Sequence, residues 1–340
     1  MTHDLAVALS LLPSLPRAGL TERLLVADPT LVELAQPRLA EARDIRAAAA
    51  RRGIHTVAWN DPAYPGHLRT LSDMPPLLWY RGALDCLAAP GVAIVGARSA
   101  STAALEAARR LGADVAARGI TVISGLARGV DSAAHRGALS TGRTAAVLGG
   151  DVGDVYPAEH AELAVEVTAN GVVLSEFPPG TPALPHHFPL RNRIISGLAR
   201  VVVVVEAAEK SGSLITAACA LEQGREVMAV PGCVLNGRNR GGHALIRDGA
   251  KIVETADDIV GGLRGPGVVP SAVLAGSSVA LPSSSGRVLL DALLPGEAYD
   301  VDAMMTASGL DGPTVLRALT DLELAGLVRR MPSGICIRVQ

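Results

Sequence analysis

The middle of the chain alternates short apolar runs with longer segments whose apolar positions have a helical spacing. The runs are rich in β-branched side chains and bounded by turn residues, which is typical of strands buried on both faces of a sheet. They begin at Val92 (VAIVGA), Thr121 (TVIS), Thr144 (TAAVL), Gly171 (GVVLS), Val201 (VVVVV), Glu226 (EVMAV) and Lys251 (KIV). This rhythm predicts an α/β fold, a doubly wound parallel sheet of extended Rossmann-like type over residues 61–263.

The segment before this sheet has a different pattern. From Leu5 to about Gly53 the spacing is helical and is broken by four prolines. We predict a small helical domain over residues 1–60, either SAM-like or a degenerate helix-hairpin-helix. The glycine hairpin of such modules is absent, which favours a structural or partner-binding role over contact with nucleic acid. The proline-rich stretch from Asp61 to Gly82 is interpreted as an ordered connector.

The end of the chain predicts a separate small domain. Residues 264–286 are rich in Gly, Pro and Ser without periodicity, which predicts a flexible linker. Residues 287–340 contain three short helical patterns and a β-prone tail, which together predict a winged helix. Its third helix has Arg317 but also Asp311, Asp321 and Glu323. Acidic side chains on a groove-reading helix would face phosphates, so a protein contact or a packing role is favoured over reading of duplex DNA.

Composition narrows the choice of partners and compartment. The net charge is -2, so any site for a polyanion must gather its cations locally. Lys210 and Lys251 are the only lysines among 31 basic residues. The four cysteines lie far apart without metal-site spacing, which predicts free thiols. The first residues lack a basic n-region, and no run reaches the ~20 apolar residues of a membrane span. We therefore expect a cytoplasmic protein without a membrane contact.

Several predicted strands end in residues that suit anions. Glycine allows close approach to the backbone, and a helix start supplies N–H donors with a partial positive charge. Because the carboxyl ends of parallel strands share one edge, these loops should lie together and suit several phosphates in succession. The residues are Gly96 to Ser99 with Arg98, Ser124 and Gly125 with Arg128, Gly149 and Gly150, and Lys210, Ser211, Gly212 and Ser213, with Arg191, Asn192 and Arg193 one connection away.

Motifs for cofactors and catalysis are weak. The spaced glycines of a dinucleotide site and of a P-loop are both missing. Asp131 and His135 have the spacing of a metal pair, but no third ligand is suitably placed, so a cap and a packed histidine are favoured. Glu206 ends the valine run without a paired carboxylate, which favours a structural role over acid/base catalysis. We predict no metal, no cofactor and no catalytic residue.

Taken together, these stretches make the sequence resemble a known family. The chain is similar to the DNA-processing protein A (DprA/Smf) family, and the matching stretches follow one another in order over most of residues 61–260. They are DPAYPGHLRTLSDMPPLLWYRG, VAIVGARSAS, SGLARGVDSAAHRGAL, YPAEH, SEFPPGTP, FPLRNRIISGLA, VVVVEAAEKSGSLITAACALEQGREVMAVPG and GGHALIRDGA.

The resemblance implies a non-catalytic, homodimeric protein that binds single-stranded DNA and loads the RecA recombinase during natural transformation. The implied DNA contacts are Arg98, Arg191, Arg193 and Lys210, and Phe188 fits the place of a base-contacting aromatic. From the residues alone, core packing of Phe188 is an equal alternative to stacking on a base.

Two positions depart from the family pattern, and one alternative function stays open. Asp151 and Gly153 stand where glycine and aspartate are usual, so we assign no DNA contact to that loop. His243 replaces a usual asparagine in a region tied to dimer packing. The alternative is a phosphoribohydrolase-like, nucleotide-processing enzyme with Glu206 as acid/base. That class should carry a P-G-G-x-G-T stretch, which this chain lacks.

Overall fold

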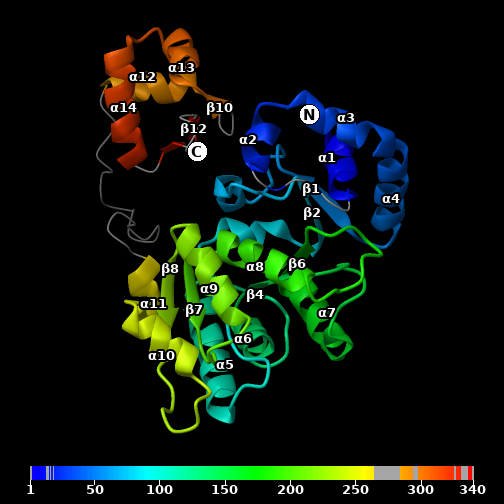
Figure 1. Cartoon of the computed structure of the whole chain (residues 1–340), viewed down its shortest axis with the longest axis vertical. Coiled ribbons are helices and arrows are strands. Elements are labelled where there is room, and N and C mark those ends of the chain that lie inside the picture. Colours follow the sequence, from blue (N-terminus) through cyan, green and yellow to red (C-terminus); the bar gives the residue numbers. More distant parts are fainter. Residues whose placement is uncertain are drawn as a thin grey trace. The chain divides into compact units, whose positions relative to one another are not determined.

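The structure is a computed structural model that describes residues 2–12, 15, 17, 19–263, 284–293, 298–324, 327–330 and 336–338. The contacts divide the chain into two compact units (Figure 1). The first comprises Met1–Thr21 and Pro29–Leu263, and the second comprises Glu22–Asp28 and Arg264–Gln340. The predicted linker falls mainly on residues 264–283, which lie outside the described residues.

The chain begins with short helices, as the spacing predicts. They are α1 (His3–Ser10), α2 (Leu20–Leu25), α3 (Pro29–Ala35), the 3-10 turn η1 (Gln36–Arg38) and α4 (Leu39–Arg51). Thr2 caps α1 by accepting a hydrogen bond from the Leu5 amide, and α3 begins at a proline, where the missing N–H costs nothing. The SAM-like or helix-hairpin-helix assignment of this segment stays a prediction.

Two strands that the sequence did not predict follow these helices. Strand β1 (His55–Ala58) pairs with β2 (Leu77–Gly82) in antiparallel register, and β2 pairs with β6 in the same way. The segment interpreted as a connector therefore contributes an edge of the main sheet, and Trp79 of β2 is fully buried. The 3-10 turn η2 (Gly66–Thr70) lies between the two strands. The sheet thus extends across residue 60, where the first domain was predicted to end.

The remaining strands form the predicted parallel sheet. Each predicted run is a strand, and apart from β9 at the edge these strands are almost entirely buried. The order across the described sheet is β1-β2-β6-β5-β4-β3-β7-β8-β9. The doubly wound α/β prediction is therefore confirmed. The parallel strands are β3 (Gly91–Val95), β4 (Thr121–Ser124), β5 (Thr144–Val147), β6 (Gly171–Ser175), β7 (Val201–Val204), β8 (Glu226–Ala229) and β9 (Lys251–Ile252).

Helices cover the sheet on both sides. Helices α5 (Thr102–Ala116), α6 (Val130–Leu139) and α11 (Ala256–Leu263) share one apolar core with alternate residues of β3 and β7. The opposite face carries α8 (His187–Leu198) and α9 (Ser213–Glu222), which contact each other and the central strands. The remaining elements are η3 (Leu84–Ala88), η4 (Ala158–His160), α7 (Ala161–Asn170) and α10 (Arg240–Arg247).

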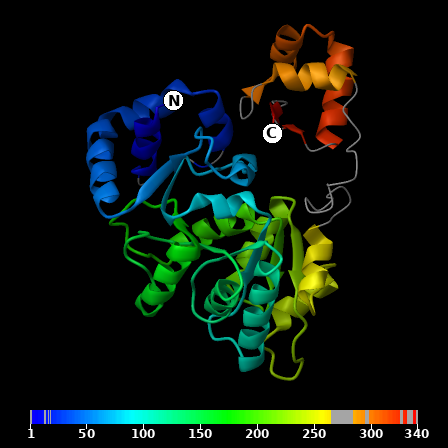
Figure 2. The ribbon, with the colours of Figure 1, turned by 180° about the vertical axis from the view of Figure 1, so that it is seen from behind.

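Helices α5 and α6 touch at the level of their backbones. Figure 2 shows them side by side below the sheet. A Cβ added to Gly137 would lie 1.9 Å from the Arg109 carbonyl oxygen, and one added to Gly112 would lie 2.4 Å from that of Ala134. Only glycine permits this approach, because any side chain at either position would overlap the facing backbone.

The second unit contains the predicted winged helix. Leu289, Met304, Val315 and Leu319 form its apolar core with Val328. Three helices pack against a small sheet of order β10-β12-β11, in place of the two strands that the sequence predicted. The elements are α12 (Ser284–Ala292), α13 (Val301–Ser308), α14 (Gly312–Leu324), β10 (Ala298–Tyr299), β11 (Val328–Arg330) and β12 (Cys336–Arg338).

The acidic side chains of the third helix, α14, lie at its start or on its surface. Asp311 accepts a hydrogen bond from the Thr314 amide at the start of the helix, 3.0 Å away, and Asp321 and Glu323 are exposed. The structure forms no disulfide between Cys86, Cys219, Cys233 and Cys336. Across the described parts of the chain, every helix is too short or too polar to cross a membrane.

The contact between α5 and α6 generates a stability prediction. Gly137→Ala should lower the free energy of unfolding by about 1–3 kcal/mol, because the new methyl group overlaps the rigid Arg109 carbonyl. Gly261→Ala in α11 is the matched control, since nothing lies within 4 Å of its added methyl group. That control should be neutral or slightly stabilising. Urea unfolding of both variants measures the difference, and equal midpoints would contradict the proposed contact.

Candidate functional site

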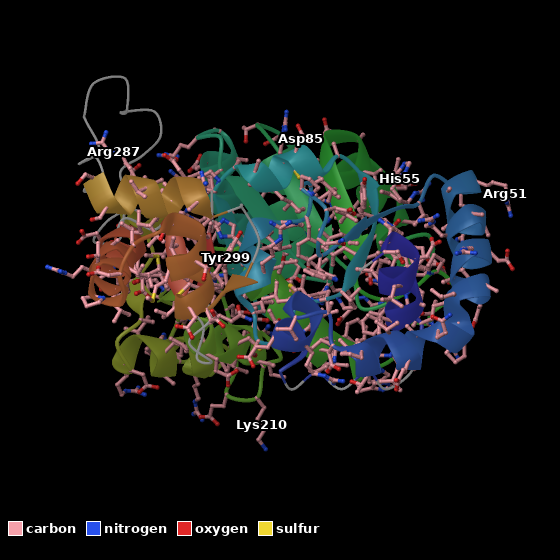
Figure 3. The ribbon with its side chains drawn as sticks, turned by 90° about the horizontal axis from the view of Figure 1, so that it is seen from above. Arg51, His55, Asp85, Lys210, Arg287 and Tyr299 are labelled. Carbon is pink, nitrogen blue, oxygen red and sulfur yellow. The ribbon has the colours of Figure 1, made fainter. Side chains whose placement is uncertain are left out.

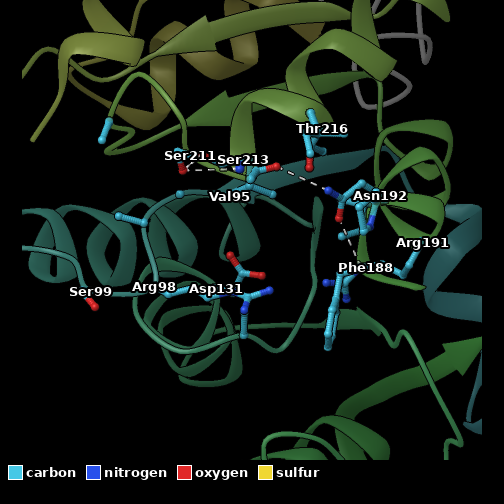
Figure 4. A pocket seen from close by; sticks show the side chains of 18 of the residues that line it. Val95, Arg98, Ser99, Asp131, Phe188, Arg191, Asn192, Ser211, Ser213 and Thr216 are labelled. Atoms are coloured by element: carbon cyan, nitrogen blue, oxygen red, sulfur yellow. Dashed lines mark hydrogen bonds between the residues drawn. The ribbon is translucent and has the colours of Figure 1, made fainter. Parts of the chain in front are cut away.

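One pocket lies at the point where the order in which the chain adds strands to the sheet reverses. The chain runs from β3 outward through β4, β5 and β6, then returns to place β7 on the other side of β3. The loops that follow β3 and β7 lead away from each other, which leaves a crevice at the carboxyl ends of these two strands. Open α/β sheets bind ligands in such a crevice. A pocket of about 790 Å³ occupies this point, and we call it the β3–β7 pocket (Figure 4). Its lining includes Val95, Arg98, Phe188, Asn192, Glu206 and Lys210.

Glu206 holds the two loops of this pocket together. Its carboxylate accepts hydrogen bonds from the Ser101 amide at 3.0 Å and from the Ser101 hydroxyl at 2.7 Å. The Ser101 hydroxyl also accepts from the Ala104 amide and so caps α5. Both carboxylate oxygens of Glu206 are therefore engaged, and its observed role is structural.

Arg191 is buried beneath the pocket and is only 4% exposed. Its guanidinium donates to the Gly125 carbonyl at 2.8 Å and to the Val147 carbonyl, so it ties the ends of β4 and β5 to α8. The guanidinium lies against Gly125 so closely that a Cβ there would meet it at 2.5 Å. Burial lowers the pKa of Arg191 to about 10, and the nearby Asp131 carboxylate opposes that shift. The side chain remains a cation at neutral pH.

Arg193 lies at the centre of a buried ion-pair cluster. Its guanidinium donates to Asp73 at 2.6 Å and to Glu176 at 2.9 Å, and Arg17 also reaches Glu176 at 3.0 Å. Only 9% of the Arg193 side chain is exposed. Burial lowers the pKa of Arg193, but the two carboxylates outweigh it and the net shift is upward. Arg193, which was predicted to contact a phosphate, therefore lies outside the β3–β7 pocket. Its charge is already neutralised by Asp73 and Glu176.

Arg98 and Phe188 do meet in the pocket. Figure 4 shows Arg98 reaching from the loop after β3 toward Phe188 at the start of α8. The guanidinium carbon lies 5.1 Å from the ring centroid, which is cation–π distance. Arg98 is exposed and Phe188 is half-buried, so both are open to a ligand. One edge of the Phe188 ring packs toward Gly149, and stacking of a base on its accessible part stays a prediction.

Lys210 stands at the other rim of the pocket. It is exposed and projects away from the ribbon in Figure 3. The hydroxyls of Ser211 and Ser213 lie 2.8 Å apart at the start of α9, and the Asn192 amide donates to the Gly212 carbonyl at 3.4 Å. All of these residues line the pocket, so α8 and α9 bring the predicted RNR and KSGS stretches side by side.

The predicted residues that follow β4 are placed differently. Ser124 is fully buried and donates its hydroxyl to the Ile94 carbonyl at 2.7 Å, while the Gly125 amide donates to Asp131 at 3.0 Å. Arg128 is exposed but forms two 2.8 Å bonds to the carboxylate of Glu159. It borders a small side pocket beside Phe188.

Two further residues at the pocket were not predicted from the sequence. Tyr156 is 52% exposed, and its ring centroid lies 5.8 Å from that of Phe188. Arg238 lines the pocket and donates to the Ser99 carbonyl at 3.0 Å. Tyr156 lies in the YPAEH stretch and Arg238 in a basic GRNR turn, so both were visible in the sequence. What was missing was the strand order that brings the two loops to one pocket.

Comparison with known proteins decides the family. The family model of DNA recombination-mediator protein A matches residues 55–264, which is more than half of the chain. The chain belongs to the DNA-processing protein A (DprA/Smf) family. A second model, the DprA winged helix domain, matches residues 275–334.

Relatives of known name support this membership. Protein Smf of Escherichia coli is 40% identical over 82% of this chain and 76% of its own length. The DNA processing protein DprA of Streptococcus pneumoniae is 43% identical over 59% of this chain and 71% of its own length. The solved structure of that S. pneumoniae protein aligns with a TM-score of 0.62 at 38% identity, covering 67% of this chain and 81% of that one.

A second solved relative comes from Helicobacter pylori. It aligns with a TM-score of 0.56 at 27% identity and covers 62% of this chain and 95% of its own. That structure is described as showing a single-stranded DNA binding mode of DNA processing protein A.

Asp131 and His135, which have the spacing of a metal pair, both make contacts within the fold of this DprA-family chain, and Asp131 lies inside α6 instead of capping it. His135 is fully buried, and its Nδ1 lies 2.7 Å from the Thr144 hydroxyl. Asp131 bonds the Gly125 amide, and burial raises the pKa of its carboxyl. Within the described residues, no group of three or more His, Cys, Asp or Glu side chains could hold a metal ion.

The buried His135 generates a pH prediction. Burial lowers the pKa of His135 from 6.5 to about 3, so the folded protein keeps the ring neutral while the unfolded chain binds a proton below pH 6.5. Stability should therefore fall as the pH drops from 6.5 toward 3, by up to about 1.4 kcal/mol per pH unit from this group. His135→Gln should lose that part of the dependence. Urea unfolding at several pH values measures it, and parallel curves for parent and variant would contradict the prediction.

Proposed function

We propose that this protein binds single-stranded DNA in the β3–β7 pocket, protects incoming DNA and loads the RecA recombinase onto it during natural transformation. The observation that carries the proposal is the pocket itself. It combines two exposed cations, Arg98 and Lys210, with the accessible ring of Phe188 at the switch point of the sheet. Cations beside a stackable ring are what sequence-tolerant binding of single strands requires. The family membership and the DNA-binding description of the H. pylori relative support it.

The residues divide into ligands and supports under this proposal. Arg98 and Lys210 contact phosphates, aided by Ser211, Gly212 and Ser213 at the start of α9 and by the amide of Asn192. Phe188 receives a base, and Tyr156 extends the aromatic surface. Arg191, Arg193, Ser124 and Gly125 are supports, because their polar groups are buried and paired within the fold. Arg128 contacts a phosphate only after it releases Glu159.

A nucleotide-processing enzyme is the alternative. It needs a carboxylate free to exchange a proton with its substrate, and Glu206 instead receives two hydrogen bonds from Ser101. We therefore favour binding without catalysis. Incubation with nucleoside monophosphates tests the choice, since release of free base would establish the enzyme.

The proposed partners follow from the family. We infer a cytoplasmic homodimer formed through the α/β domain near Ala244, Leu245 and Ile246 of α10, whose side chains are half-buried in the single chain. His243 of the same helix departs from the family pattern. Its ring is within hydrogen-bond distance of the Gly232 carbonyl, so this side chain has a partner within its own chain. Sedimentation at tens of micromolar, on the order of protein-interface affinities, tests the dimer. Faster assembly of RecA on single strands in its presence tests the loading.

The first binding prediction concerns Lys210. Lys210→Ala should weaken binding of oligo-dT and of mixed sequences by the same factor, because a phosphate contact carries no sequence information. The magnitude of the salt slope should fall by about 0.7. Lys251→Ala removes the only other lysine, which lies on β9 and pairs with Glu226 of β8, and this variant should bind like the parent. Titration of labelled oligonucleotides at two salt concentrations measures both variants. Equal affinity of Lys210→Ala and parent would place the DNA elsewhere.

The second binding prediction concerns Phe188. Phe188→Ala should weaken binding by ~1–3 kcal/mol, the range of base–aromatic stacking. Stacking carries no net charge, so the salt slope should stay close to that of the parent. The same titration separates this result from that of Lys210→Ala. A change in slope without a loss of affinity would show that the ring acts only by positioning Arg98.

A further inference from the structure

A second groove adjoins the β3–β7 pocket. It has a volume of about 460 Å³ and lies between α5 and α6, and we call it the α5–α6 groove. Helix α5 contributes Thr102, Glu106 and Arg109, and α6 contributes Arg136. Arg98 and Ser99 line this groove and the β3–β7 pocket alike, so the two cavities meet at the loop after β3.

The two helices that line the groove meet at a glycine contact. Gly137 lies against the Arg109 carbonyl, so the backbones approach at the level of Arg109 and Arg136. Both arginine side chains then lie on the walls of the groove. Arg98 and Ser99 separate the groove from the pocket. Their loop is held in place because Arg238 donates to the Ser99 carbonyl at 3.0 Å.

The groove is locally positive although the chain is not. Arg98, Arg109 and Arg136 face a single carboxylate, that of Glu106, whereas the whole chain has a net charge of -2. The carboxylate of Glu106 is paired with Arg109, whose guanidinium donates hydrogen bonds to it at 2.9 and 2.6 Å. Arg136 is exposed, and no carboxylate of the described residues lies within 4.0 Å of its guanidinium. The described lining contains no aromatic ring, so the groove offers charge without a surface for stacking.

We propose that the α5–α6 groove is a second segment of the single-stranded DNA path and holds backbone phosphates of nucleotides beyond those in the β3–β7 pocket. This inference rests on the proposed function and extends it. A polyanion that fills the pocket can leave it over Arg98 and Ser99, and the next cations along that route are Arg136 and Arg109. Because only phosphates are contacted there, the groove adds affinity for longer strands without adding sequence preference.

The test compares two lengths of oligo-dT, about 4 and about 16 nucleotides, which span the usual site sizes of single-strand binding folds. Arg136→Gln should weaken binding of the longer strand about threefold to tenfold and lower its salt slope by about 0.7. It should leave the shorter strand, which fits the pocket alone, bound as by the parent. Arg110→Gln is the matched control: Arg110 is exposed on α5, does not line the groove, and lies 3.9 Å from Asp114.

A second variant should act in the opposite direction. Glu106→Gln removes the carboxylate from the groove and frees Arg109, so the longer strand should bind more tightly and with a steeper salt slope. Glu166→Gln, at an exposed position of α7, makes the same change in net charge away from the groove and should do neither.

The outcomes separate this inference from the proposed function. If the parent and Arg110→Gln bind both lengths and a folded Arg136→Gln matches them on the longer strand, the groove is not part of the path. An equal loss on both lengths would also overturn it, because Arg136 would then act on the pocket. If the parent binds neither strand, the proposed function itself fails and the groove fails with it.

Discussion

The buried guanidinium of Arg191 determines the geometry on which the site depends. By donating to carbonyls at the ends of β4 and β5, it fixes where α8 begins relative to the sheet. Phe188, Asn192 and Ile195 recur at helical spacing on the same face as Arg191, so all of them are directed at the β3–β7 pocket. Arg193 lies on another face and anchors the helix to Asp73 and Glu176. Two buried cations thus orient the helix, and Phe188, Asn192 and Ile195 face the β3–β7 pocket.

The placement of charge follows from the cost of burial. A cation removed from water must be paired or must donate to carbonyls, and the buried arginines of α8 do one or the other. Some of the cations that remain open lie on loops at the sheet edge. Arg98 and Lys210 are examples, and neither has a carboxylate of the described residues within 4.0 Å. A chain with a small net negative charge therefore still presents a local positive surface.

The sequence predicted the seven parallel strands, the helices and the winged helix because each leaves a periodic signal in one segment. It did not predict β1 and β2, since LLWYRG in a proline-rich stretch lacks alternation and its partner β6 lies far along the chain. For the site, the residue types of the RNR and KSGS stretches were informative, but their exposure was not. Whether Arg193 faces a ligand or Glu176 depends on a carboxylate 17 residues away, brought near only by the fold. The same holds for Tyr156 and Arg238, which depend on strand order.

The pairing of Arg98 with Phe188 has a consequence for the free protein in water. An aromatic ring at a pocket mouth, beside a second ring at Tyr156, leaves apolar surface in contact with water. The Arg98 guanidinium lies over the ring and places a positive charge at that surface. If single-stranded DNA binds here as proposed, a base that stacks on this face of the ring displaces the Arg98 guanidinium, which lies over it in the free protein. In that case the ring and the guanidinium, which contact each other in the free protein, each become available to the strand.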